Sequence, residues 1–150
     1  MKTCVVDASI AVKWVVDEAD TPAALRLRAE HRLIAPDLLV PECANILWKK
    51  VRRGEMEAHA ALLAARLLES ADIELLASRP LLEAIARLAI ELDHPAYDCL
   101  YLAMAVENAC PFVTADESFV RKMHQRRHSP YSEAVVSLAE ALGRGADSVH

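Results

Sequence analysis

Glycine is scarce in this chain of 150 residues, with three in total, at positions 54, 143 and 145. A loop that cradles a nucleotide phosphate needs several glycines close together, so a glycine-rich phosphate loop is excluded. The sequence also lacks Gly-x-Ser-x-Gly and His-Glu-x-x-His, the motifs of many serine hydrolases and zinc peptidases. Asp7 is followed by Ala8 and Ser9, so the acid pairs of haloacid-dehalogenase-type phosphatases and of receiver domains are missing.

The four cysteines form no Cys-x-x-Cys pair. Zinc sites usually show such paired spacings, whereas each cysteine here lies inside or beside an apolar run. We therefore expect buried free thiols, rather than a zinc site or disulfide bonds, at positions 4, 43, 99 and 110.

Long apolar runs are missing too, although 54% of the residues are hydrophobic. No uncharged apolar segment reaches the roughly 20 residues that cross a bilayer. Met1, Lys2 and Thr3 lead directly into a strand-like run, without the features of a signal peptide. We therefore expect a cytoplasmic protein without membrane contact, folded as one domain over residues 1–150. The net charge of −5 does not by itself suggest a nucleic-acid binder.

Strand-like and helix-like segments alternate along the chain. The expected strands are 2–6, 33–35, 73–76 and 111–114, and the expected helices are 9–16, 22–31, 38–53, 55–70, 80–93, 97–109 and 116–125. Residues 134–138 fit either an edge strand or the start of a terminal helix, and the tail from Gly143 to His150 is expected to fray. This alternation predicts a parallel sheet covered by helices on both faces.

Local signals support several helix boundaries. Thr21 is expected to cap the helix that has Pro22 in its first turn. Gly54 is placed to end the helix 38–53. In the helix 80–93, one apolar face is predicted at helical spacing, formed by Leu82, Ile85, Ala89 and Leu92.

Four acids stand at the starts or ends of four separate apolar segments: Asp7, Glu42, Asp98 and Asp116. Asp7 and Asp116 follow predicted strands, and the carboxyl ends of parallel strands gather ligands at one edge of a sheet. Clustered carboxylates repel one another unless a cation lies between them, so their positions suggest a site for a hard metal ion. Carboxylate-bound metal with no nucleophile motif nearby indicates phosphodiester hydrolysis.

Each acid also has a purely structural explanation. Asp7 and Asp116 are placed to cap helices, and Glu42 would interact favourably with a helix dipole. Asp98 is the strongest candidate, because its neighbours are aromatic and apolar and an isolated charge there is costly. Polar groups near these acids are expected to support the site: Ser9, Asn45 and Thr114. Asp93 and His94 precede Pro95 and are interpreted as loop.

Basic residues gather in two places, at 49–53 and 121–128. Both groups end helices that begin near a candidate acid, so they either complement a helix dipole or contact nucleic-acid phosphates. The residues chosen as candidate phosphate contacts are Lys49, Arg53, Arg121 and Lys122.

These features give the chain a resemblance to PIN-domain proteins, and specifically to the VapC toxins of bacterial toxin–antitoxin pairs. Four segments carry it, in order, over residues 1 to about 120: Val5-Val6-Asp7-Ala8-Ser9 with Val12-Lys13-Trp14, Pro41-Glu42-Cys43-Ala44-Asn45, Tyr97-Asp98-Cys99-Leu100-Tyr101-Leu102-Ala103, and Thr114-Ala115-Asp116 with Phe119. One such motif would be weak, whereas four in this order are specific.

The resemblance implies a three-layer α/β/α sandwich around a parallel sheet and a ribonuclease that requires Mg²⁺ or Mn²⁺. The family's acidic quartet would fall on the four acids above, with Asp7, Asp98 and Asp116 as direct ligands and Glu42 acting through water. Glu117 or Ser118 would supply a further polar group. The resemblance also implies a homodimer and a cognate antitoxin that blocks the active site and binds operator DNA.

Two alternatives stay open at this stage. The chain is either a catalytically active nuclease or a silent PIN-fold module that binds RNA or an antitoxin. As a nuclease, it would act as a toxin or as a non-toxin enzyme on other RNA or on DNA.

Overall fold

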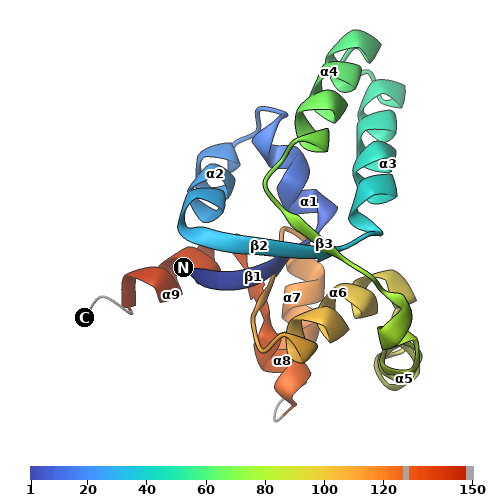
Figure 1. Cartoon of the computed structure of the whole chain (residues 1–150), viewed down its shortest axis with the longest axis vertical. Coiled ribbons are helices and arrows are strands. Elements are labelled where there is room, and N and C mark those ends of the chain that lie inside the picture. Colours follow the sequence, from blue (N-terminus) through green and yellow to red (C-terminus); the bar gives the residue numbers. More distant parts are fainter. Residues whose placement is uncertain (127–128, 148–150) are drawn as a thin grey trace.

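The computed structural model describes residues 1–126 and 129–147. Five parallel strands form one sheet in the order β3-β2-β1-β4-β5. Figure 1 shows β1, β2 and β3 of this sheet. The strands are β1 (Lys2–Val6), β2 (His31–Pro36), β3 (Glu74–Leu76), β4 (Phe112–Thr114) and β5 (Val135–Ser137). The parallel sheet that the alternating pattern predicts is confirmed. Of residues 134–138, which fit either an edge strand or the start of a terminal helix, 135–137 form the edge strand and residue 138 begins the last helix.

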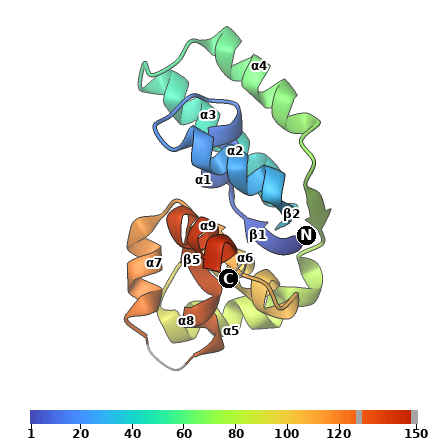
Figure 2. The same ribbon diagram turned by 90° about the vertical axis from the view of Figure 1, so that its left-hand side faces the viewer.

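Helices cover both faces of this sheet. The helices are α1 (Ala8–Ala11), α2 (Thr21–Glu30), α3 (Leu39–Arg52), α4 (Ala58–Glu69), α5 (Leu82–Leu92), α6 (Ala96–Glu107), α7 (Glu117–His124), α8 (Pro130–Ala134) and α9 (Leu138–Asp147), with short 3₁₀ helices at Val12–Trp14 and Arg79–Leu81. Helices α1 to α4 lie on one side and α5 to α8 on the other, as Figures 1 and 2 show. The result is the expected three-layer α/β/α fold.

The strand order creates a switch point between β1 and β4. The chain proceeds from β1 to β2 and β3 in one direction, and then places β4 and β5 on the other side of β1. Val5 pairs with Phe112 and Val6 with Val113, so the carboxyl ends of β1 and β4 lie side by side. Ligands of open parallel sheets bind at such a point, where the connections diverge to opposite faces.

The core lies on both sides of these central strands. Val5, Val6, Phe112 and Val113 are fully buried, as expected for parallel strands covered on both faces. The rings of Tyr101 on α6 and Phe112 on β4 stack with centroids 5.5 Å apart, which fixes α6 against the sheet.

Several local expectations need correction. Thr21 does not cap α2, because the cap position belongs to Asp20 and the Thr21 hydroxyl donates to the Val16 carbonyl. Leu82 is 68% exposed, and Leu88 takes its place on the buried face of α5, because the helix turns that face towards α6. The expected helix 9–16 is shorter and tightens into a 3₁₀ turn at Val12–Trp14.

The predicted ends of α3 and α9 can be compared with the structure. Gly54 ends α3 as predicted, with φ +74° and with hydrogen bonds from Gly54 N to Val51 O and from Glu55 N to Lys50 O. The tail from Gly143, which is expected to fray, includes the end of α9, since this helix runs to Asp147. Ala141 and Leu142 anchor the helix in the core, and fraying beyond them stays a prediction. Residues 148–150 of that tail lie outside the described residues.

The cysteines are free thiols throughout the described residues. Cys4, Cys43 and Cys99 are buried, as expected, and Cys110 is half-buried. Burial raises the pKa of Cys4 and Cys43 to about 12, so neither thiol forms a thiolate at neutral pH. In the part of the chain that the structure describes, no helix is both long and apolar enough to span a bilayer.

Candidate active site at the carboxyl edge of the sheet

Asp7 lies at the centre of the switch point. It follows β1 directly, is 8% exposed, and caps α1 by accepting a hydrogen bond from the Ile10 amide. Its Oδ1 also accepts from Ser9 Oγ at 2.5 Å, and its Oδ2 accepts from Thr114 Oγ1 at 2.6 Å. Both carboxylate oxygens are therefore fixed by short hydrogen bonds.

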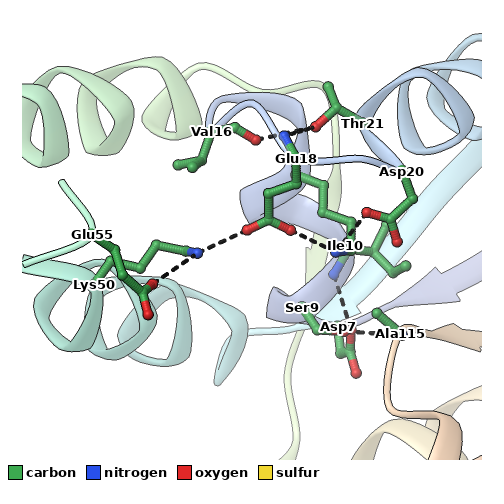
Figure 3. Close-up of polar contacts among 11 residues, drawn as sticks. Asp7, Ser9, Ile10, Val16, Glu18, Asp20, Thr21, Lys50, Glu55 and Ala115 are labelled. Atoms are coloured by element: carbon green, nitrogen blue, oxygen red, sulfur yellow. Dashed lines mark hydrogen bonds and ion pairs between the residues drawn. The ribbon is translucent and has the colours of Figure 1, made fainter. Parts of the chain in front are cut away.

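Ser9 and Thr114 join the two sides of the switch point. The Ser9 hydroxyl, while donating to Asp7, accepts from the Ala115 amide at 3.1 Å (Figure 3). The Thr114 hydroxyl accepts from the Asp116 amide at 3.1 Å. These two hydroxyls thus hold the loop after β4 against the Asp7 carboxylate. Their expected role in supporting a metal site stays a prediction.

Burial makes the charge on Asp7 unfavourable. Desolvation raises the pKa of Asp7 to about 6, and the hydrogen bonds from the two hydroxyls and the Ile10 amide offset only part of that rise. The negative charge of Asp98 adds to it. The carboxylate is therefore held rigidly in a place where it would be stabilised by a nearby cation.

Glu42 lies in the first turn of α3 and faces the same place. Its Oε1 is buried and has no hydrogen-bond partner among the described residues. Burial raises the pKa of Glu42 to about 7, with further contributions from the charges of Asp7 and Asp98. The Tyr101 hydroxyl is near enough to moderate that rise, yet the two groups do not meet in hydrogen-bond geometry.

Asp98 lies in the first turn of α6 and is half-buried. Its Oδ2 is 2.6 Å from Nε2 of His94, and Nδ1 of His94 is 3.1 Å from the Lys122 ammonium. Because the ammonium only donates, Nδ1 accepts and Nε2 carries the proton that is donated to Asp98. His94 is in the loop before α6, as expected, but its contact with Asp98 was missed, since Pro95 obscures the four-residue spacing.

Asp116 is the most exposed of the four acids and has a structural role. It caps α7, with Oδ1 accepting from the Phe119 amide at 3.1 Å and from Ser118 Oγ at 2.7 Å. Glu117 points to solvent, where its Oε2 is 4.0 Å from Nη1 of Arg121. The structural explanation for Asp116 as a helix cap is therefore correct. Both hydrogen bonds that the Asp116 side chain makes within the described residues are accepted by Oδ1.

The structure brings three of the four acids within electrostatic reach of one another. The charge of Asp98 raises the pKa of Asp7, and the charges of Asp7 and Asp98 raise the pKa of Glu42. Asp116 is joined to Asp7 through the Thr114 hydroxyl. Across residues 1–126 and 129–147, no three His, Cys, Asp or Glu side chains are already arranged to hold a metal ion. The acids are thus adjacent, but Asp98 is turned to His94 and Asp116 to the start of α7.

Some of the predicted basic side chains are held by contacts within the protein, whereas others are exposed. Lys50 contacts Glu18 at 2.8 Å and Glu55 at 3.7 Å (Figure 3), and the Arg52 guanidinium lies over the Trp48 ring. Lys49 and Arg53 are exposed, as is Asn45 one turn after Glu42. Residues 127 and 128 of the second group lie outside the described residues.

The part of the chain that carries these site residues also matches a known protein family. The stretch 4–124, which contains all four acids, matches the PIN domain family. The chain belongs to the PIN domain family. PIN domains are generally nucleases, and many use divalent metal ions. No curated protein shows significant sequence similarity to this chain.

Three solved structures resemble this PIN domain. PAE2754 from Pyrobaculum aerophilum is 25% identical, with a TM-score of 0.70, and the match covers 97% of this chain and 96% of that one. VapC20 of Mycobacterium tuberculosis, a toxin that cleaves the sarcin-ricin loop, is 17% identical, with a TM-score of 0.58 and coverage of 87% and 94%. VapBC2 of Rickettsia felis, bound to a promoter DNA fragment, is 14% identical, with a TM-score of 0.63 and coverage of 90% and 98%. At these identities, the last two establish the shared fold.

Proposed function

We propose that this PIN-domain protein is a ribonuclease that hydrolyses phosphodiester bonds with Mg²⁺ or Mn²⁺ held by Asp7, Glu42, Asp98 and Asp116. The observation that carries the proposal is the buried, unpartnered Oε1 of Glu42 beside two further acids. A buried carboxylate without a partner is costly, and a cation would remove that cost.

The donor set fits a hard divalent cation. All four candidate ligands are carboxylates, which Mg²⁺ and Mn²⁺ prefer. Burial raises the pKa of the Cys43 thiol, which neighbours Glu42 in the chain, to about 12, so this thiol keeps its proton. Burial, and after it the charges of neighbouring acids, raise the pKa values of Asp7 and Glu42, so a bound cation would favour their ionised forms. When bound, the cation supplies activation of the attacking water and charge stabilisation at the phosphate.

The chain's own residues then orient and hold the ligands. Ser9 and Thr114 fix both oxygens of Asp7. His94 holds Asp98, and the Lys122 ammonium fixes the tautomer that donates to it. Asp116 caps α7 through Oδ1 and would use its second oxygen for the cation. We assign Asp7, Asp98 and Asp116 to direct coordination and Glu42 to coordination through water.

Positive side chains would place the RNA strand across this edge. Lys49 and Arg53, in the last turn and at the C-cap of α3, and Arg121 on α7 are exposed and able to contact phosphates. Lys122 is also assigned to this group, although its ammonium contacts His94 and the Asp93 carbonyl. Asn45 is placed to bind either water or a ribose hydroxyl near Glu42.

We further propose that the chain is the toxin of a VapBC-type pair. The structural likeness to VapC20 and VapBC2 supports this assignment. The toxin assignment implies a homodimer that acts on RNA in the cytoplasm and a cognate antitoxin that covers the acidic edge.

Induced expression of the protein should arrest bacterial growth, and the Asp98→Asn substitution should abolish this arrest. Equal growth arrest by both forms at equal protein levels would contradict the toxin assignment.

RNA cleavage by the purified protein tests the nuclease proposal. We expect cleavage with Mg²⁺ or Mn²⁺, none with EDTA, and none by the Asp98→Asn variant. The matched control is Asp72→Asn, which changes an exposed aspartate before β3 and should cleave as the wild type does. If the folded Asp98→Asn variant cleaved RNA at the wild-type rate, the assignment of the site would be wrong. A DNA strand of the same sequence tests the alternative substrate.

A further inference from the structure

Tyr101 occupies a fixed place beside the acidic edge. It lies on α6, one turn after Asp98, and is 1% exposed. Its ring stacks on Phe112 of β4 with an interplanar angle of 13°. Packing from helix and sheet therefore leaves the hydroxyl little freedom of position.

The Tyr101 hydroxyl makes no hydrogen bond to the described residues. Its oxygen is buried and has no hydrogen-bond partner in the described part of the chain. Buried polar groups are nearly always hydrogen-bonded within the protein. Burial removes their hydrogen bonds to water, and a group that gains no partner in exchange is destabilising. A phenylalanine would fill the same space without this cost, so the fold alone does not explain the hydroxyl.

Acids lie within electrostatic reach of this hydroxyl. After desolvation, the charges of Glu42, Asp7 and Asp98 are among the main causes that raise the pKa of Tyr101, so the phenol keeps its proton. The hydroxyl is thus a donor that faces ionisable acceptors. Asp7 already accepts from two other hydroxyls, whereas Oε1 of Glu42 has no partner. The Tyr101 hydroxyl is therefore a buried donor and Glu42 Oε1 a buried acceptor, and neither has a partner among the described residues.

We propose that Tyr101 is a positioning residue, whose hydroxyl donates a hydrogen bond to the ionised Glu42 carboxylate when the site binds its cation. This inference rests on the proposed function. A donor on a packed ring would hold one carboxylate oxygen and turn the other towards the cation or its water. Outer partners of this kind commonly set metal affinity, because they orient the ligand before binding.

The test compares Tyr101→Phe with Tyr97→Phe. Tyr97 lies one turn earlier on α6 and is 66% exposed, so its hydroxyl is a matched control for the same substitution. We expect Tyr101→Phe to weaken Mn²⁺ binding about tenfold in calorimetry, the lower end of the range for outer-partner changes. Without metal, its melting temperature should equal or exceed that of the wild type. Tyr97→Phe should change neither quantity.

Unchanged Mn²⁺ affinity in Tyr101→Phe would overturn the inference, as would a clear loss of metal-free stability, which would assign the hydroxyl a structural role. A wild type that binds no Mn²⁺ would contradict the proposed function itself and this inference with it.

A double-mutant cycle tests whether the hydroxyl acts through Glu42. In a Glu42→Gln background, Tyr101→Phe should have little further effect on Mn²⁺ affinity, because the acceptor charge is already gone. An equal tenfold loss in both backgrounds would show that the hydroxyl acts on another group, and would overturn the assignment to Glu42.

Discussion

Nε2 of His94 lies 2.6 Å from Oδ2 of Asp98, and the ring is held from its other side by Lys122 and by Phe119, whose ring centroid is 4.6 Å away. A histidine that orients a ligand carboxylate resembles the outer partners of many metal sites. Its position in the loop between α5 and α6 places it at the amino end of the helix that carries Asp98.

Replacing His94 should therefore impair the site without unfolding the protein. We expect His94→Ala to lower RNA cleavage by about 10- to 100-fold, the range typical of such partners. The matched control is His59→Ala on α4, whose side chain is 80% exposed. Circular dichroism would check the fold. A His94→Ala variant with the wild-type rate would contradict the orienting role.

Thr114 should contribute to both stability and activity. Thr114→Val keeps the shape but removes the donor to Asp7 and leaves the Asp116 amide without its acceptor. We expect a loss of about 1–3 kcal/mol in the free energy of unfolding, as for other buried groups left unpaired, together with slower cleavage. Thr3→Val, at the opposite end of β1, is the control. Denaturant titration would measure both variants, and equal stability of the two would refute this role.

Glu42 should oppose folding at neutral pH in the absence of metal. Its folded-state pKa of about 7 exceeds the ordinary value of 4.5, so the folded state binds more protons than the unfolded state between these pH values. Its contribution to stability is therefore retained below about pH 4.5 and lost as the pH rises towards 7. Glu42→Gln should be more stable than the wild type at pH 8, with the difference shrinking towards pH 5. Thermal unfolding in EDTA measures this, and a larger gain at pH 5 would contradict it.

Metal binding should offset the loss of folding stability that the ionised Glu42 causes. The stability gained from the metal should increase as the pH rises. A cation binds the ionised carboxylates and competes with protons at Asp7 and Glu42, whose pKa values are about 6 and about 7. Saturating Mn²⁺ should therefore raise the melting temperature more at pH 8 than at pH 5.5. A shift that is equal at both values would show that these two acids do not take part in binding.

The two neighbouring lysines at the end of α3 should behave differently. Lys49 is exposed, whereas Lys50 is bound to Glu18 and Glu55. We expect Lys49→Ala to weaken RNA binding and reduce its salt dependence while leaving stability unchanged. Lys50→Ala should mainly lower stability. Filter binding at several salt concentrations, beside thermal unfolding, separates the two effects, and the reverse pattern would disprove this division of roles.

The sequence was sufficient to predict the layers of the fold and the neighbourhood of the site. Strand and helix alternate clearly, and acids at strand ends converge because parallel strands place their carboxyl ends at one edge. Asp7 and Asp116, more than a hundred positions apart, could thus both be expected at this edge, and the structure joins them through Thr114. That residues 1–150 behave as one domain stays a prediction, which a single cooperative unfolding transition would support.

Side-chain contacts between loops could not be predicted in the same way. His94 is separated from α6 by Pro95, so no helical periodicity links it to Asp98. Leu82 has the spacing of a buried residue but is exposed, because the neighbour that α5 packs against decides which side is covered. The unpartnered Tyr101 hydroxyl is likewise invisible in the sequence, where its ring simply continues an apolar segment.

The position of bound Mn²⁺ in crystals of the protein, located by its anomalous scattering, would test the proposed site most directly. We expect a peak at the carboxyl edge of β1 and β4, surrounded by oxygens of Asp7, Asp98 and Asp116 and within one water of Glu42. No peak there at saturating Mn²⁺, or a peak bound only by other residues, would contradict the four-carboxylate metal site.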